Sequence, residues 1–259
     1  MNSILNEIVV RNRAALEEKK RIVPFDEIVE RAAAAPERAD FVEAFRGPGV
    51  HVIAELKKAS PSKGLIRESL DVPVLANALK EAGAAALSVL TEPFYFKGGL
   101  ENLQLASETV SIPLLRKDFI FDPYQIVEAK AYGASAILLI AAMLNADEFA
   151  RLLDCAHRYG LAVLGEAHTE SELDLASSAD LIGINARDLK TFSTSLERSA
   201  ALIAGLRQYG KPVVAESAVR TGEDVRMLRE AGASGFLIGE TLMRADDPGA
   251  KLKELLQCF

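Results

Sequence analysis

Short apolar runs alternate with amphipathic stretches along the chain from about residue 50 onward. Each run has the length of a β-strand and is bounded by Gly, Pro or Asp. The runs contain few alternating polar positions, which is typical of strands that are buried on both faces. The pattern predicts eight strands, at residues 51–56, 85–90, 112–117, 135–140, 161–166, 180–185, 211–216 and 234–239.

Helical periodicity fills the segments between these runs. Apolar residues recur there at i, i+3 and i+4, and several segments close with Gly, the usual residue just past a helix end. The clearest segments are residues 72–83, 124–133, 146–160, 196–210 and 223–232. Alternating strands and helices imply parallel pairing through right-handed crossovers. Eight such units favour a (β/α)8 TIM barrel over an open doubly wound sheet, and no GxGxxG follows the first strand.

The first 47 residues lie outside this repeat and have a helical pattern at residues 4–21 and 24–35. No linker rich in Gly, Ser or Pro separates them from the repeat. We therefore expect one α/β domain over residues 1–259, with an N-terminal helical extension at 1–47 and a (β/α)8 barrel at 48–259.

The composition narrows the class of protein. With 49% hydrophobic and 26% charged residues, the chain is neither disordered nor collagen-like, and its lack of Trp predicts an aliphatic core. A net charge of −7 argues against sequence-independent binding of nucleic acid. No apolar run reaches the ~18 residues of a membrane span, and the amphipathic N-terminus carries acidic residues and does not resemble a signal peptide. We expect a cytoplasmic protein with two free thiols, Cys155 and Cys258, because these lack CxxC spacing.

Polar and charged side chains stand at the carboxyl ends of five predicted strands. They are Glu55 with Lys57, Lys117 with Asp118, Glu166, Asn185 with Arg187, and Glu216 with Ser217. In TIM barrels this end of the strands carries the active site. Because side chains alternate along a strand, Glu55 and Lys57 share one face. A charge buried without a partner costs several kcal/mol, so such a cluster indicates mutual compensation and a functional site.

The cations in this set predict an anionic substrate. Lys57, Lys117 and Arg187 would place three positive charges at the mouth of an acidic protein. The loops after the last two strands are the usual phosphate site of a barrel, where Ser217 offers a hydroxyl and Gly239 allows close backbone approach. We infer a small substrate with a phosphate at one end and a second anion near Lys57 and Arg187.

The histidines contribute no metal site to this prediction. His51, His157 and His168 are scattered, so they give no metal constellation and no metal is expected. His168 follows Glu166 by two residues, and we interpret it as a residue that caps or hydrogen-bonds a loop. The absence of a GxSxG motif argues against a serine triad.

One segment resembles a known family closely. VIAELKKASPSKG at residues 52–64 is similar to the signature of indole-3-glycerol phosphate synthases, decarboxylating lyases of tryptophan biosynthesis. Residues 114–126, 183–189, 213–219 and 236–244 resemble further motifs of that family in the same order. The resemblance covers nearly the whole chain. It implies conversion of 1-(2-carboxyphenylamino)-1-deoxyribulose 5-phosphate into indole-3-glycerol phosphate, CO₂ and water, without a cofactor.

The resemblance also implies roles for individual residues. Lys117 matches the general acid that protonates the ribulose carbonyl, and Lys57 matches a lysine that contacts the anthranilate carboxylate and serves in dehydration. Glu166 matches the carboxylate that stabilises a cationic intermediate and takes a proton. The remaining positions match orienting residues (Glu55, Asn185), a strand-end pair (Glu216, Ser217), a phosphate site (Ser217, Ala218, Gly239, Glu240) and a shell around the anthranilate (Ser60, Phe96, Phe119, Arg187).

Two positions depart from the family pattern. Ala218 stands where Gly is frequent, which would make a left-handed backbone conformation more costly there. Ala186 stands where a second Asn is frequent. For the catalytic lysine we expect a pKa near neutral, on the premise that burial and neighbouring cations disfavour its charge.

Three alternatives remain open from the residues. The first is an aldolase-type barrel in which Lys117 forms a Schiff base. The second is a sugar-phosphate isomerase of the phosphoribosylanthranilate isomerase type, which would place an Asp or Cys pair at the strand ends. The third is a barrel that binds a ligand without catalysis. In each case we expect a monomer that binds no nucleic acid and no membrane.

Overall fold

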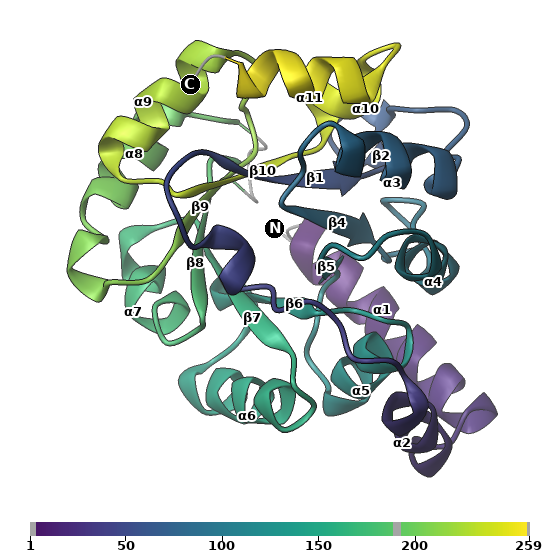
Figure 1. The fold of residues 1–259 in the computed structure, drawn as a ribbon. Coiled ribbons are helices and arrows are strands. Elements are labelled where there is room, and N and C mark those ends of the chain that lie inside the picture. Colours follow the sequence, from purple (N-terminus) through teal and green to yellow (C-terminus); the bar gives the residue numbers. More distant parts are fainter. Residues whose placement is uncertain (1–3, 189–192, 258–259) are drawn as a thin grey trace.

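The computed structural model describes residues 4–188 and 193–257, and its centre is a closed barrel of eight parallel strands (Figure 1). The barrel strands are β1 (His51–Leu56), β4 (Ala86–Leu90), β5 (Leu114–Lys117), β6 (Ala136–Ile140), β7 (Ala162–Ala167), β8 (Leu181–Asn185), β9 (Val213–Glu216) and β10 (Gly235–Ile238). Each pairs with the next in sequence, and β1 closes the barrel by pairing with both β4 and β10. All eight predicted strands are thus confirmed, with small differences at their ends.

Helices surround the barrel on the outside (Figure 1). They are α3 (Val72–Glu81), α4 (Leu100–Thr109), α5 (Pro123–Ala131), α6 (Ala146–Arg158), α7 (Leu173–Ala176), α8 (Leu196–Ala204), α9 (Gly222–Ala231), α10 (Glu240–Arg244) and α11 (Pro248–Leu256), with short 3-10 turns η2 (Ala141–Met143), η3 (Glu170–Glu172) and η4 (Arg207–Tyr209). The five predicted helices are confirmed as α3, α5, α6, α8 and α9. These five segments did not include α4, whose buried face is only Leu103 and Ala106, α7, which has four residues, or the last two helices, α10 and α11.

Local sequence fixes where several helices begin. Asp122 accepts a hydrogen bond from a backbone N–H of the first turn of α5, while the Gln125 side chain accepts one from the Asp122 N–H. Asn145 with Glu148 at α6 forms the same capping box. These reciprocal bonds satisfy backbone donors that the helix itself leaves unpaired. The helices therefore begin at sharply defined points directly after the loops that follow the strands.

The loop after β1 contains a small hairpin that the apolar pattern did not predict. Its strands are β2 (Ala59–Ser60) and β3 (Gly64–Leu65), which pair antiparallel. Two-residue strands are too short to produce a periodic signal. The hairpin places the segment 60–63 beside the carboxyl end of β1.

Two helices and a turn precede the barrel, as predicted for the N-terminal extension. They are α1 (Ile4–Ile22), α2 (Phe25–Ala34) and η1 (Glu43–Phe45). Figure 1 places the start of α1 near the centre of the barrel in projection, and α2 beside α5. Phe45 packs against Gly235, where any added Cβ would lie 2.7 Å from its ring, so this extension also closes the amino-terminal end of the barrel. That residues 1–47 and 48–259 form one domain, with the boundary between extension and barrel at residue 47, stays a prediction.

The described residues contain no helix that is long and apolar enough to cross a membrane. Cys155 is a buried free thiol on α6, and Cys258 lies outside the described residues.

Candidate active site

Four charged residues form one layer inside the barrel. Glu55, Lys117, Glu166 and Glu216 come from β1, β5, β7 and β9, which are alternate strands of the closed sheet. A TIM barrel interior is built from layers of four side chains from alternate strands. Two residues earlier on the same strands, the side chains are aliphatic: Ile53, Leu115, Leu164 and Val214. We call the four charged residues the charged layer. The layer directly below it in the barrel consists of these buried aliphatic side chains.

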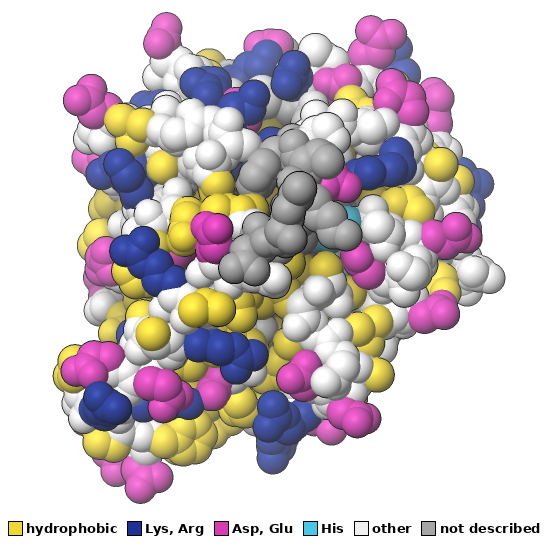
Figure 2. All heavy atoms as spheres, turned by 180° about the vertical axis from the view of Figure 1, so that it is seen from behind, with side chains coloured by type: hydrophobic (Ala, Val, Ile, Leu, Met, Phe, Trp, Pro, Cys, Tyr) yellow, Lys and Arg dark blue, Asp and Glu magenta, His cyan; other side chains and the backbone are white. Residues whose placement is uncertain are grey.

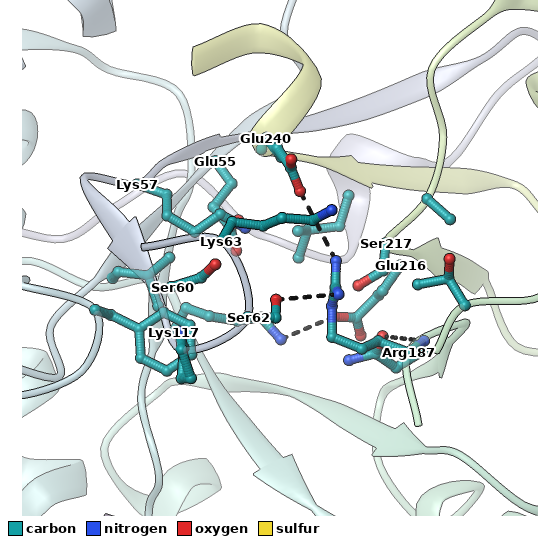
Figure 3. Close-up of a pocket in the computed structure, with 18 of the residues that line it drawn as sticks. Glu55, Lys57, Ser60, Ser62, Lys63, Lys117, Arg187, Glu216, Ser217 and Glu240 are labelled. Atoms are coloured by element: carbon teal, nitrogen blue, oxygen red, sulfur yellow. Dashed lines mark hydrogen bonds and ion pairs between the residues drawn. The ribbon is translucent and has the colours of Figure 1, made fainter. Parts of the chain in front are cut away.

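A cavity of about 730 Å³ opens above this layer at the carboxyl ends of the strands. Its walls include all of the predicted site residues, brought together from every part of the barrel: Glu55, Lys57, Ser60, Phe96, Lys117, Phe119, Glu166, Asn185, Arg187, Glu216, Ser217, Ala218, Gly239 and Glu240. Figure 3 shows charged and hydroxyl side chains from the β1–β3 segment, β5, β9 and α10 converging on one space. The volume is in the range of small-molecule sites.

Lys117 lies at the centre of the charged layer. Its Nζ donates to Glu166 Oε2 at 2.6 Å and to Glu216 Oε2 at 2.8 Å, and 12% of its side chain is exposed. Burial by itself lowers the pKa of Lys117, but the carboxylates of Glu166, Glu216 and Glu55 outweigh burial and raise this pKa above its ordinary value. The expectation of a lysine with a pKa near neutral is therefore wrong in this structure, because anions rather than cations surround the ammonium.

The two carboxylates on Lys117 are in different states. Burial favours the neutral form of Glu166, yet the positive charges of Lys117 and His168 hold its pKa well below its usual range. Burial and the neighbouring Glu166 raise the pKa of Glu216 to about 8 against the opposing charge of Lys117. Near neutral pH the site therefore contains an ionised Glu166 and a largely protonated Glu216, a separation typical of acid–base sites.

Glycines leave room for two of these carboxylates. A Cβ on Gly239 would collide with the Glu55 carboxylate, and a Cβ on Gly183 would collide with that of Glu216. The Lys57 ammonium pairs with Glu55, so these two neighbours on one strand face point into the same cavity, as predicted.

Arg187 holds the opposite wall together. It donates to the Ser62 hydroxyl at 3.2 Å, and its Nη2 lies 3.9 Å from Glu240 (Figure 3). The backbone N–H of Arg187 donates to Asn185 Oδ1 at 3.0 Å, which orients the end of β8. Glu240 is also bound by Arg244, 3.0 Å away. The guanidinium is thus held at the cavity by groups from two segments, the turn between β2 and β3 and helix α10.

The backbone after β9 adopts an unusual conformation. Ser217 and Ala218 both have positive φ angles, 66° and 64°. Left-handed conformations are costly for residues with a Cβ, and they turn successive N–H groups toward one side. The departure at Ala218 therefore falls on a position where the conformational freedom of Gly matters, as predicted.

Aromatic rings line another part of the cavity. The rings of Phe96 and Phe119 lie 6.1 Å apart. The loop that carries Phe96 is organised by Glu92, a fully buried carboxylate that accepts hydrogen bonds from three successive backbone N–H groups, including that of Phe96 at 2.9 Å. Apolar residues of α1 face the same space: Ile4, Leu5 and Ile8.

The structure adds cavity residues that the sequence interpretation missed. Further polar residues in the walls are Ser62, Lys63, Ser193, Thr194, Arg220, Thr241, Arg244 and Lys251. Ser62 and Lys63 lie inside the 52–64 signature, and Arg244 ends a quoted motif, so their position in those motifs was an available signal. Lys251, on α11, had none.

A family model described as "Indole-3-glycerol phosphate synthase" matches residues 5–255. A protein of that name from Koribacter versatilis is 51% identical over 260 residues, covering 99% of this chain and 100% of that protein. One from Carboxydothermus hydrogenoformans is 44% identical, covering 97% of this chain and 99% of its own. One from Neisseria gonorrhoeae is also 44% identical, covering 98% of this chain and 100% of its own.

Solved structures with low sequence identity share the fold. A 3-hexulose-6-phosphate synthase aligns with a TM-score of 0.65 and 16% identity, covering 82% of this chain and 100% of that one. A mutant tryptophan synthase α-subunit from Pyrococcus furiosus aligns with a TM-score of 0.62 and 16% identity, covering 80% and 98%. At such identity the likeness concerns the barrel alone.

Proposed function

The chain belongs to the indole-3-glycerol phosphate synthase family, a family of carboxy-lyases of tryptophan biosynthesis, and from this premise we propose how its cavity performs the reaction. The substrate is 1-(2-carboxyphenylamino)-1-deoxyribulose 5-phosphate, which carries an anion at each end. The observation that carries the proposal is Lys117, held between Glu166 and Glu216 at the bottom of a cavity that has cations on its walls.

We propose that the two ends of the substrate bind on opposite sides of the charged layer. Ser217 and Ala218 after β9, with Gly239 and Glu240 after β10, receive the phosphate. Lys57 and Arg187 face the anthranilate carboxylate, where Ser60 contributes a hydroxyl. Phe96 and Phe119 cover the aromatic ring, since their rings lie 6.1 Å apart beside the apolar residues of α1. Anchoring both ends brings the reacting carbons together, which supplies much of the rate by orientation.

Ring closure requires a proton at the ribulose carbonyl oxygen. The aromatic carbon that bears the carboxylate attacks the carbonyl carbon, and Lys117 donates a proton to the carbonyl oxygen as the carbon–carbon bond forms. The carboxylates around Lys117 keep its ammonium charged until that moment. The bond to the carboxylate then breaks, CO₂ leaves, and its electron pair restores the aromatic ring.

Dehydration completes the sequence. The hydroxyl formed by ring closure leaves as water with a proton from Lys57, and Glu166 takes the proton that the resulting cation loses. An ionised Glu166 suits both stabilisation of the cation and proton removal. Glu55 pairs with Lys57, Asn185 fixes the end of β8 and Glu216 holds Lys117, so these three residues orient the acids and base.

The activity has a direct test. The purified protein is mixed with the carboxyphenylamino-deoxyribulose phosphate, and the indole product is followed by its fluorescence. The absence of Trp leaves little protein signal beneath that of the product. Formation of indole-3-glycerol phosphate with release of one CO₂ is expected, and a mixture that yields no indole-3-glycerol phosphate would refute the assignment.

A Schiff base at Lys117, the aldolase-type alternative, makes a different prediction. Borohydride added with substrate would reduce such an adduct and inactivate the enzyme covalently. Acid catalysis by Lys117 predicts that the same treatment leaves the lysine unmodified, as judged by peptide mass. The enzyme should also keep its full activity.

We further propose that the enzyme acts as a monomer in the cytoplasm and needs neither a cofactor nor a metal. The apolar positions Ile8, Leu16 and Ile28 of the extension are buried within the chain itself, which supports a monomer. Light scattering coupled to size-exclusion chromatography gives the molar mass in solution, which tests whether the protein is a monomer.

A further inference from the structure

One histidine lies buried beside the Glu166 carboxylate of the charged layer. His168 follows the end of β7 and is only 4% exposed. Its Nε2 lies 3.2 Å from Glu166 Oε1, and its Nδ1 lies 3.4 Å from Glu172 Oε2; these are ion-pair distances, and neither contact has the geometry of a hydrogen bond. His168 is not among the described residues that line the cavity, so its contact with the Glu166 carboxylate lies outside the cavity wall.

The two oxygens of Glu166 are therefore held by different cations. Oε2 faces the Lys117 ammonium at 2.6 Å, while Oε1 faces the His168 ring. A carboxylate held at both oxygens cannot rotate freely about its last torsion, so the oxygen that faces the cavity keeps one direction. Catalytic groups work best when their orientation is fixed to within about 10–20°.

The ring is itself fixed by Glu172. The Glu172 carboxylate lies beside Nδ1 and also accepts a hydrogen bond from the His168 backbone N–H at 2.7 Å. This arrangement of carboxylate, imidazole and second carboxylate favours a doubly protonated ring, since a carboxylate oxygen lies within ion-pair distance of each nitrogen. Burial alone lowers the pKa of His168, but Glu166 and Glu172 outweigh burial and raise this pKa to about 9.

We propose that His168, oriented by Glu172, is a positioning residue that aims the Glu166 carboxylate at Lys117 and the substrate. The inference deepens the proposed function, on which it rests, because it concerns the same carboxylate. The interpretation from sequence, a histidine that serves only its loop, accounts for Glu172 but not for the contact with Glu166.

Three substitutions separate the two contacts. In His168→Gln the amide nitrogen reaches the place of Nε2 and keeps a donor to Glu166. In His168→Asn the shorter amide reaches only the place of Nδ1, and His168→Leu removes both donors. The backbone bond to Glu172 is available in all three, so the loop can fold in each of them.

The expected results follow from the contact that each variant keeps. His168→Gln should retain kcat within about threefold of wild type. His168→Asn and His168→Leu should lose about 10–100-fold in kcat, the usual effect of removing a residue that orients a functional ligand, with KM changed less than about threefold. Unfolding by urea measures the stability of each variant beside its kinetics.

Two outcomes would overturn the positioning role. One is a wild-type kcat in His168→Asn and His168→Leu. The other is equal loss in the Gln and Asn variants in proportion to their loss of stability, which indicates a structural role only.

A second measurement does not depend on turnover. With 3 histidines in the chain, the ring ¹⁵N signals of His168 are assigned by comparison with His168→Asn. The charged groups that face this ring are Glu166 on β7 and Glu172 on η3, with Lys117 beyond Glu166. Both ring nitrogens should carry protons at pH 7.5 in wild type, and Glu166→Gln should lower the titration midpoint. A ring that is neutral at that pH refutes the inference even where the protein makes indole-3-glycerol phosphate. A charged ring in a protein that makes none leaves the contact intact and refutes the proposed function instead.

Discussion

At the scale of single residues, the chemistry depends on how charge is distributed around Lys117. Burial lowers the pKa of Lys117, but the negative charge around it, above all that of Glu166, outweighs burial and raises this pKa, so the free enzyme holds the proton that ring closure consumes. If cations surrounded Lys117, its ammonium would be a stronger acid, but the lysine would often be unprotonated at neutral pH. Of the two acidic partners of Lys117, Glu166 is ionised and Glu216 is largely protonated at neutral pH. The protonated Glu216 reduces the negative charge around the ammonium.

Removal of the ammonium should abolish turnover without unfolding the barrel. General acid catalysis contributes about 10²–10⁴ in rate, so Lys117→Ala should lose at least about a hundredfold in kcat. Lys80→Ala, an exposed lysine on α3, is the matched control and should keep wild-type kinetics. Steady-state assays and circular dichroism check both variants. Activity of Lys117→Ala within about threefold of wild type would contradict the general-acid role.

Glu216 should make stability depend on pH. Its pKa is raised to about 8, so the native state keeps a proton that the unfolded chain releases near its ordinary value of 4.5. The corresponding stability is complete below pH 4.5 and is lost as the pH rises through 8. Glu216→Gln cannot ionise, so the unfolding free energy of wild type relative to this variant should fall between about pH 5 and pH 8.5. Urea titrations at several pH values measure this difference in unfolding free energy. A difference that rises with pH would contradict a raised pKa of Glu216.

At the scale of elements, strand alternation explains why so much of the site was predictable. Polar residues at the ends of strands otherwise made of Val, Ile and Leu stand out in the sequence, and parallel pairing brings such ends together. The sequence could not predict that β1, β5, β7 and β9 contribute one layer, since layering depends on the register of the closed sheet. For the same reason it misjudged the surroundings of Lys117, whose partners come from β7 and β9.

The left-handed turn after β9 predicts that an Ala→Gly substitution stabilises the protein there, whereas the same substitution within a helix destabilises it. Ala218 has a φ of 64°, where an L-residue is strained by roughly 1–2 kcal/mol. Ala218→Gly removes this strain and should stabilise the protein by about 0.5–1 kcal/mol after the extra chain entropy of Gly. Ala201→Gly, at an exposed position within α8, should instead destabilise by about 1 kcal/mol. Equal destabilisation of both variants, measured by urea unfolding, would show that the turn carries no strain.

At the scale of the whole molecule, the N-terminal extension belongs to both the site and the core. Its apolar residues reach the cavity at α1, while Phe45 closes the opposite end of the barrel. The sequence predicted these helices, but not their contacts, because an amphipathic pattern identifies a buried face without identifying what covers it. Figure 2 shows side chains of both signs interspersed over one face of the molecule.

The attachment of the extension should be mainly hydrophobic. Lys19 pairs with Glu128 at 2.8 Å but is 40% exposed, and such pairs contribute at most about 1 kcal/mol. Leu16 lies in the main core and is 6% exposed, so Leu16→Ala should cost about 2–5 kcal/mol. Lys19→Ala is the control and should cost less than about 1 kcal/mol.

If residues 1–47 and the barrel form one domain, Leu16→Ala should lower the urea midpoint of the entire transition. Far-ultraviolet circular dichroism follows all helices, while indole-3-glycerol phosphate synthesis follows the cavity, and the two curves should stay superimposed. Loss of activity at lower urea than loss of helix would mean that α1 detaches first. The extension would then be a separately folding part, because the strands and outer helices would survive its release.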